Sequence, residues 1–326
     1  SEQEDRLPDT LLASAHKMYN LRYGENGHQS AALYIDPKAV DTNSTLVTAH
    51  VEGGKQMSYN NYSDADATLR LCRSLSTDEW PDTPHACVIV KHNSPCGVGL
   101  GKNVSEAFTR ALDVDSLSAF GGVVAINKKC TVDLAKKIDK IFFEIIVAPS
   151  FDVGSLKIFS KKKNLRVLSL KKYLSPEFSI KTIGGGSLGQ ERDGSCLLEK
   201  HLITPTKKKL TPNQLSTGLF AWKVVKHTKS NAIVVAKNNK IISISGGQTS
   251  RVDATKIAFE KTKIPKGCVV ASDAFFPFKD SIEKMAQYKI AAIIQPGGSI
   301  RDSEVVWTHL SLLVPGLALV LSQPLR

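Results

Sequence analysis

The stretch Ala86-Cys87-Val88-Ile89-Val90-Lys91-His92-Asn93-Ser94-Pro95-Cys96-Gly97 decides how the chain is interpreted. Residues 86–90 are apolar and β-rich, which predicts a strand buried on both faces of a sheet. Such sheets are covered by helices and bind ligands in the crevice beyond the carboxyl ends of their strands. We therefore expect Lys91 and His92 at a binding edge, where the pair suits general-base chemistry on a substrate that also needs a cation. Taken alone, a solvated Lys-His doublet at a strand end is the more frequent explanation.

The composition indicates a globular protein with anionic ligands. The chain has 326 residues, 42% of them hydrophobic, which is enough for one large core or two to three smaller ones. Its 43 Lys and Arg residues against 31 Asp and Glu residues give a net charge of +12. With 7% aromatic residues and no helix-turn-helix or zinc-finger spacing, we expect no nucleic-acid partner, and RNA binding remains a distant alternative.

Cysteine usage and hydropathy bear on the compartment. The six cysteines are scattered without a C-x-x-C pair, so we expect reduced thiols in a cytosolic protein. Residues 310–321 form the most apolar segment, but Pro315-Gly316 interrupts it. It is also shorter than the roughly 20 residues that cross a bilayer, so no membrane partner is expected.

Alternating strand and helix patterns predict an α/β fold. The expected strands lie at 46–51, 86–90, 123–126, 144–148, 165–168, 232–236 and 291–295. The expected helices lie at 65–75 (with its cap in residues 58–64, which begin with Ser58), 105–112 (with Ser105 as its cap), 132–141, 211–225 and 281–287. We divide the chain into a mobile N-terminal arm (1–17), a first lobe (18–155), a connecting segment (156–225) and a second lobe (226–326). The connecting segment holds a helix and a glycine cluster at 184–190, which lacks phosphate-loop spacing and favours a flexible hairpin.

The second half of the chain resembles the first in outline, which indicates two related lobes. The expected helix 281–287 and strand 291–296 match helix 132–141 and strand 144–149. The turn at 272–278 matches the turn at 118–121. Three loops, 246–251, 277–280 and 295–302, combine glycine or proline with charged ends and are interpreted as ligand-binding loops.

The sequence contains only part of a zinc-site pattern. His50-Val51-Glu52 together with Pro95-Cys96 approaches the zinc deaminase pattern, in which a second cysteine follows three residues after the first. Position 99 is Gly, so one thiolate ligand is missing. We predict no catalytic metal, and we expect Cys96 to be a small packed residue.

Several ordered motifs resemble one known family, the AICAR transformylase part of the bifunctional purine-biosynthesis protein. The resemblance extends over nearly the whole chain from Asn20 onward. The motifs are Leu21-Arg22-Tyr23-Gly24-Glu25-Asn26, Ser58-Tyr59-Asn60-Asn61, Lys91-His92-Asn93-Ser94-Pro95-Cys96-Gly97, Ser118-Ala119-Phe120-Gly121-Gly122, Lys229-Ser230-Asn231-Ala232, Gly247-Gln248-Thr249-Ser250-Arg251-Val252-Asp253, Ser272-Asp273-Ala274-Phe275-Phe276-Pro277-Phe278 and Gln295-Pro296-Gly297-Gly298-Ser299-Ile300-Arg301-Asp302.

The resemblance implies formyl transfer from 10-formyltetrahydrofolate to the amine of AICAR, giving FAICAR on the route to IMP. It also implies two cytidine-deaminase-like lobes without zinc, and a homodimer with shared active sites. By motif, His92 is the expected proton acceptor, Lys91 stabilises the transition state and Asn231 orients the substrate. The expected AICAR-binding residues are Arg22, Tyr23, Phe120, Gly121, Glu144, Arg251, Phe275 and Arg326, and the expected folate-binding residues are Val252, Asp280, Ser299 and Ile300.

Two departures from the family pattern bear on activity. The family carries an IMP cyclohydrolase domain ahead of the Arg22-Tyr23 loop, and little chain precedes that loop here, so cyclohydrolase activity is not expected from this chain. The family pattern ends with Arg, an aromatic residue and His, whereas the last residues here are Gln323-Pro324-Leu325-Arg326. The alternative to an active transformylase is therefore an inactive or regulatory relative that binds AICAR or another nucleotide.

Overall fold

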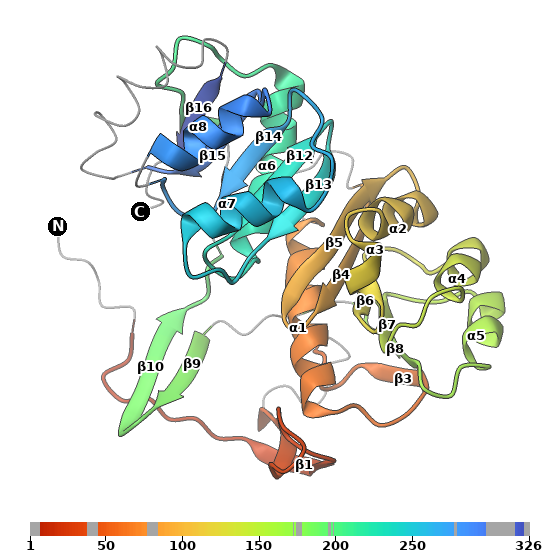
Figure 1. Cartoon of the computed structure of the whole chain (residues 1–326). Coiled ribbons are helices and arrows are strands. Elements are labelled where there is room, and N and C mark those ends of the chain that lie inside the picture. Colours follow the sequence, from red (N-terminus) through yellow and green to blue (C-terminus); the bar gives the residue numbers. More distant parts are fainter. Residues whose placement is uncertain are drawn as a thin grey trace.

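The computed structural model describes residues 7–37, 45–76, 84–171, 173, 178–194, 197, 199–276, 279–297 and 317–322. Two six-stranded mixed sheets, each associated with helices, form the two lobes of this described part of the chain (Figure 1). The fold is therefore mixed α/β, in agreement with the class predicted from the sequence.

The first lobe has the strand order β3-β8-β7-β6-β4-β5. β6, β7 and β8 are parallel to one another, and β4 runs antiparallel to both β5 and β6. The strands are β3 (His50–Gly53), β4 (His85–Lys91), β5 (Ser94–Gly101), β6 (Val123–Ile126), β7 (Ile145–Ala148) and β8 (Arg166–Ser169), and the helices are α1 (Tyr59–Ser74), α2 (Val104–Leu112), α3 (Ser116–Ala119), α4 (Val132–Ile138) and α5 (Val153–Phe159).

The second lobe has the strand order β11-β16-β15-β14-β12-β13, with the same pattern of directions. β14, β15 and β16 are parallel, and β12 runs antiparallel to β13 and β14. The strands are β11 (Leu202–Ile203), β12 (Ile233–Lys237), β13 (Lys240–Ser245), β14 (Val269–Ser272), β15 (Ala292–Pro296) and β16 (Ala318–Ser322), and the helices are α6 (Pro212–Lys226), α7 (Arg251–Glu260) and α8 (Lys279–Gln287).

Two small antiparallel sheets and a short helix complete the described elements. β1 (His16–Leu21) pairs with β2 (Ala31–Ile35), and a 3-10 helix, Glu199–His201, precedes β11. β9 (Phe178–Ile183) and β10 (Gly186–Glu191) form a hairpin that stands apart from both lobes in Figure 1. The expected hairpin at the 184–190 glycine cluster is thus confirmed, with Gly185 in the left-handed region at φ 79°.

The shared strand order supports the expected relation between the lobes, but one of the matches made from sequence is wrong. β14 corresponds to β6, so α8 and β15 correspond to α4 and β7, as expected. The turn at Ser118 precedes β6, whereas the turn at Ser272 follows β14. These turns lie at opposite ends of equivalent strands. The match from sequence rested on a serine followed closely by Ala-Phe, which carries no information about strand direction.

The two lobes pack through α1, α6 and the inward faces of both sheets. Alternate residues of β4 face opposite layers, as the two-residue period of a strand requires. Val88 and Val90 join a buried cluster that includes α6 and β12, whereas Cys87 and Ile89 pack against α2 and α4. β4 is therefore buried on both faces, as its apolar sequence predicted.

Strand β5 was not predicted, because its sequence is rich in glycine. A Cβ atom added at Gly97 would lie 2.2 Å from the carbonyl oxygen of Ala111, and one added at Gly99 would lie 2.2 Å from the carbonyl oxygen of Ala107. The glycines therefore let α2 pack directly against the strand. They also lack the side chains from which a strand is normally predicted, which explains why β5 was missed.

Most expected strand starts lie within one residue of the observed starts, whereas α1 begins six residues before the expected helix 65–75. Ser58 and Thr211 cap α1 and α6, each with a reciprocal capping box. α2 is capped by Asn103 instead of the expected Ser105. The strand expected at 46–51 is wrong in most of its length, since β3 begins only at His50.

Acid should weaken the packing around His227, which follows α6. Burial, together with the nearby Lys226 ammonium, lowers the pKa of His227 to about 4. The unfolded chain, with a His pKa of about 6.5, binds a proton that the folded chain excludes. The contribution of the neutral His227 to the free energy of unfolding is thus fully present above pH 6.5. It falls by about 3 kcal/mol as the pH decreases to 4.

Urea unfolding at pH 7.5 and pH 5 measures this effect. We expect His227→Gln to lose part of the pH dependence, whereas His28→Gln, at an exposed loop position, keeps it. Equal pH dependence in His227→Gln and the wild type would contradict the assignment.

Candidate active site

The Lys91-His92 doublet lies in the turn between β4 and β5. Lys91 pairs with Ser94, so His92 and Asn93 form a two-residue turn, with φ angles of 52° and 59°. Left-handed backbone at both positions matches the twist of a two-residue hairpin. The carboxylate of Asp64 on α1 accepts hydrogen bonds from the amides of His92 at 3.2 Å and Asn93 at 2.7 Å.

The expectation of a site beyond carboxyl strand ends is wrong in the first lobe. Val90 pairs with Val123, the first residue of β6, because β4 runs opposite to β6, β7 and β8. Lys91 therefore lies where the three parallel strands begin. In the second lobe, the loop 246–250 and Asp273 follow β13 and β14 directly, so these residues do lie beyond carboxyl strand ends.

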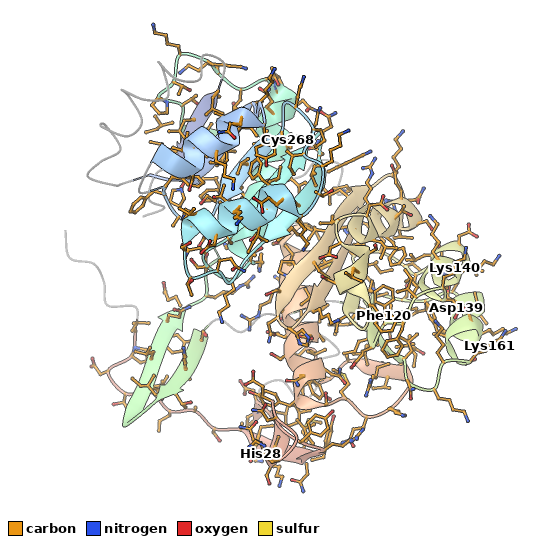
Figure 2. All side chains as sticks on the ribbon, in the orientation of Figure 1. His28, Phe120, Asp139, Lys140, Lys161 and Cys268 are labelled. Carbon is orange, nitrogen blue, oxygen red and sulfur yellow. The ribbon has the colours of Figure 1, made fainter. Side chains whose placement is uncertain are left out.

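An exposed aromatic pair lies beside Lys91. The Lys91 Nζ donates to the Phe120 carbonyl at 2.8 Å, and the rings of Phe120 and Phe142 lie 5.3 Å apart. Figure 2 labels Phe120 on the first lobe. Gly121 has φ 75° and donates its amide to the Phe142 carbonyl at 2.8 Å. Only glycine adopts this conformation without strain, which explains the glycine after Phe120.

Glu144 is held by groups from two other elements. Its Oε2 accepts from Asn61 Nδ2 at 2.5 Å and lies 3.6 Å from Nη1 of Arg166. Burial and the charge of Arg22 lower the pKa of Arg166, while Glu144 and Tyr23 oppose this effect. These residues therefore form one electrostatic group at the amino ends of β7 and β8, and Arg22 also stacks over the Tyr23 ring at 5.5 Å.

Asn231 and Arg251 form a second group in the other lobe. Arg251, the first residue of α7, is buried and donates to Asn231 Oδ1 at 2.7 Å and to Asp273 Oδ1 at 2.6 Å. Asn231 in turn donates from Nδ2 to the Gln248 carbonyl at 2.9 Å. The orientation of the Asn231 amide is therefore set by Arg251 on one side and by the 246–250 loop on the other.

Asp273 is the counter-ion of this buried guanidinium. Burial alone would raise its pKa, but hydrogen bonds from Arg251, Ser230 and the Ala232 amide outweigh burial and lower the pKa below its ordinary value. The carboxylate is thus ionised at neutral pH and neutralises Arg251.

A cavity of roughly 390 Å³ lies between the lobes. Lys91 and His92 line one wall, and Gly246 and Gln248 line another. Because Gln248 also binds Asn231 through its carbonyl, one loop separates the Lys91-His92 doublet from the Asn231 group. Among the described residues, no hydrogen bond or ion pair connects the Arg22–Glu144 group directly to Asn231 or Arg251.

An ion pair between the lobes forms part of the cavity wall. Lys261, which follows the last residue of α7, lies 2.5 Å from Asp115, whose side chain is 8% exposed. Cys96 also lines the cavity, but burial and the Asp115 charge raise the pKa of its thiol to about 12. The thiol is therefore protonated and unreactive at neutral pH, and Cys96 is a packed residue, as expected.

The remaining predicted site residues are only partly placed. Val252 is exposed on the first turn of α7, and Phe275 is 41% exposed just beyond β14. Asp280 lies in α8, but its side chain is outside the described part of the structure. Ser299, Ile300 and Arg326 lie outside the described residues altogether.

The residues considered for zinc are far apart. His50 and Glu52 lie on β3 and Cys96 lies on β5, at opposite edges of a six-stranded sheet. With about 4.8 Å between neighbouring strands, they cannot share an ion. In the described ranges, no group of three His, Cys, Asp or Glu side chains has a metal-binding arrangement. No described helix combines the length and apolarity needed to span a bilayer.

Sequence reasoning gave no role to Asp64, Asn61, Arg166 or Asp273. All four contact predicted site residues from elements distant in sequence. Asp64 was interpreted only as part of a helix cap, Asn61 as part of that cap and of a family motif, and Arg166 as a strand residue. Asp273 belongs to a family motif, but the residues next to it in sequence do not indicate its ion pair with Arg251.

Comparisons with known proteins give one consistent result. The AICARFT/IMPCHase bienzyme family matches residues 1–261. The chain is similar to bifunctional purine biosynthesis protein PurH of Aquifex aeolicus, with 48% identity over 89% of this chain and 56% of that protein. PurH proteins of Bacillus cytotoxicus and Persephonella marina are each 44% identical over 93% of this chain and 58% of their own length. The chain thus spans little more than half the length of these curated relatives.

Removing the Asp273 carboxylate should be costly, because it leaves the Arg251 charge buried without a partner. We expect Asp273→Ala to lower the free energy of unfolding by about 3–5 kcal/mol. Asp273→Asn should lower the free energy of unfolding by less, because an Asn side chain can still accept from the Ala232 amide. Asn127 makes this bond at the equivalent position of the first lobe: it accepts from Ala86 N at 2.8 Å, as Asp273 accepts from Ala232 N at 2.7 Å.

Asn127→Ala is the matched control, because it removes a neutral acceptor at the equivalent position. Urea unfolding of the three variants provides the comparison. The ion-pair assignment is wrong if Asp273→Ala costs no more than Asn127→Ala.

Proposed function

The chain belongs to the AICARFT/IMPCHase bienzyme family, and we propose that it transfers a formyl group from 10-formyltetrahydrofolate to the amine of AICAR. One observation carries the proposal. A strained turn places a histidine and a lysine together on the wall of a cavity between the lobes, and the loop that binds Asn231 lines the same cavity. This combination supplies a base, a cation and an amide for one reacting centre.

The chemistry of formyl transfer fits these groups. The amine of AICAR is conjugated with a carboxamide and is a poor nucleophile, so its proton must leave as the bond to the formyl carbon forms. A neutral His92 accepts that proton. The tetrahedral intermediate carries an oxyanion, and a Lys91 ammonium that donates one of its protons to Phe120 has others left for it.

Binding of the nucleotide is assigned to the group around Glu144. Arg22 and Tyr23 would hold AICAR together with Phe120, Gly121 and Glu144. The guanidinium of Arg22 can donate two parallel hydrogen bonds to a phosphate, and Arg166 adds a second cation beside Arg22. The exposed Phe120 ring offers a face for the base.

The second lobe would complete the site. Asn231 would orient the substrate, with Arg251, Phe275 and Arg326 as further AICAR contacts. The contacts of Arg251 with Asp273 and Asn231 indicate that it acts on AICAR mainly by holding Asn231. The folate would bind near Val252, which is exposed beside Arg251; the other proposed folate contacts are Asp280, Ser299 and Ile300.

Assembly, fold family and compartment are parts of the same proposal. The two lobes share one strand order, in which β4 or β12 runs antiparallel to the neighbouring set of three parallel strands. This shared order supports two cytidine-deaminase-like lobes. A homodimer would let the Glu144 group of one copy meet the Asn231 group of another, since the two groups share no direct bond within the described part of one chain. The buried cysteines of the described ranges carry free thiols, which fits the cytosol.

Replacement of His92 tests the proposal. We expect His92→Asn to lower kcat for formyl transfer by about 10²- to 10⁴-fold, because the general base is lost. Asn is the matched substitute, since Asn238 adopts φ 50° at the equivalent turn position of the second lobe. AICAR binding, measured by calorimetry, should stay within a few-fold of the wild type. Near-normal formyl transfer by this variant would remove His92 from the mechanism.

A further inference from the structure

The two lobes contain the same two-residue turn, and this allows a comparison within one molecule. The second-lobe turn between β12 and β13 has φ angles of 50° at Asn238 and 55° at Asn239. It therefore repeats the left-handed conformations of His92 and Asn93. In both lobes, the first and last residues of the hairpin are the paired ends of the two strands.

Each turn is also held by the helix that precedes its first strand. Ser63 on α1 donates to Asn93 Oδ1 at 2.7 Å, and Ser216 on α6 donates to Asn239 Oδ1 at 3.1 Å. The equivalence therefore extends to individual atoms, although the two helices differ in most of their residues.

The residue after each serine differs between the lobes. Thr217 accepts one hydrogen bond, from the Asn239 amide at 3.0 Å. Asp64 accepts the corresponding bond from Asn93 and a second one from the His92 amide at 3.2 Å. The additional acceptor is thus directed at the backbone of the residue that we assign as the base.

The turn itself does not account for this second bond. The second lobe builds the same turn with a neutral residue, Thr217, and with Asn238 at the position of His92. His and Asn adopt left-handed backbone more often than most residues, but the conformation is still uncommon and unfavourable for any residue other than glycine. A carboxylate bond to the His92 amide offsets that strain, because hydrogen bonds to a charged acceptor are stronger than neutral ones.

We infer that Asp64 is a positioning residue that holds His92 at the cavity wall. Each of its oxygens accepts a hydrogen bond from one of the two turn amides, so the role we assign to it is exerted through His92. Asn61, three residues earlier on the same face of α1, binds Glu144, so one helix sets His92 relative to the Glu144 group. The inference rests on the proposed function, since only a reacting His92 needs this precision.

Asp64→Thr reproduces the second-lobe arrangement and tests the inference. We expect the bond to Asn93 to remain and the bond to His92 to be lost. kcat for formyl transfer to AICAR should fall by about 10- to 100-fold, because small misplacements of a reacting group have effects of this size. KM for AICAR should change less than threefold, and backbone hydrogen exchange in a peptide spanning residues 90–95 should become faster.

Thr217→Val is the matched control, because it removes the equivalent bond from the second-lobe turn. We expect a lower Tm and faster exchange around Asn239, with kcat unchanged. A kcat of Asp64→Thr within twofold of the wild type would overturn the inference, as would equal kcat losses in both variants. A wild-type chain without formyl transfer would instead overturn the proposed function and the catalytic part of the inference, and faster exchange at His92 would then support its positional part.

Discussion

The Asp64 carboxylate holds the backbone of His92 in its turn, and the arrangement of the candidate site depends on that turn. Two consecutive left-handed residues without glycine are unfavourable for an isolated chain, and the bonds from Asp64 and Ser63 on α1 offset this cost. Because α1 packs into the core between the two sheets, the position of the turn is tied to the buried core of the molecule.

The second lobe uses a buried ion pair for a comparable purpose. Arg251 and Asp273 are both largely shielded from water, and each is satisfied by several hydrogen bonds. At the equivalent positions, the first lobe has Val104 and Asn127, which need no charge neutralisation. The ion pair is therefore not required by the fold, and its consequence is a fixed orientation of the Asn231 amide.

These two differences show how a repeated fold has been adapted. Both lobes keep the strand order, the turn conformation and the helix-to-turn serine bond. The charged residues that differ between the lobes lie around Lys91 in the first and around Arg251 in the second. Since the doublet and the Asn231 loop line one cavity, residues that are not equivalent in the repeat come to lie near each other.

The sequence by itself determined the buried strand β4, the helix starts at Ser58 and Thr211, and the family, because apolar runs, caps and ordered motifs are local in the chain. It missed β5, whose glycines follow from the close approach of α2. It also placed Lys91 at the wrong end of the parallel strands, since the direction of β4 relative to β6 is set by pairing between distant residues. Only the tertiary structure decided that Asp64 binds the His92 amide and that Asp273 neutralises Arg251, because each contact joins residues more than 20 positions apart.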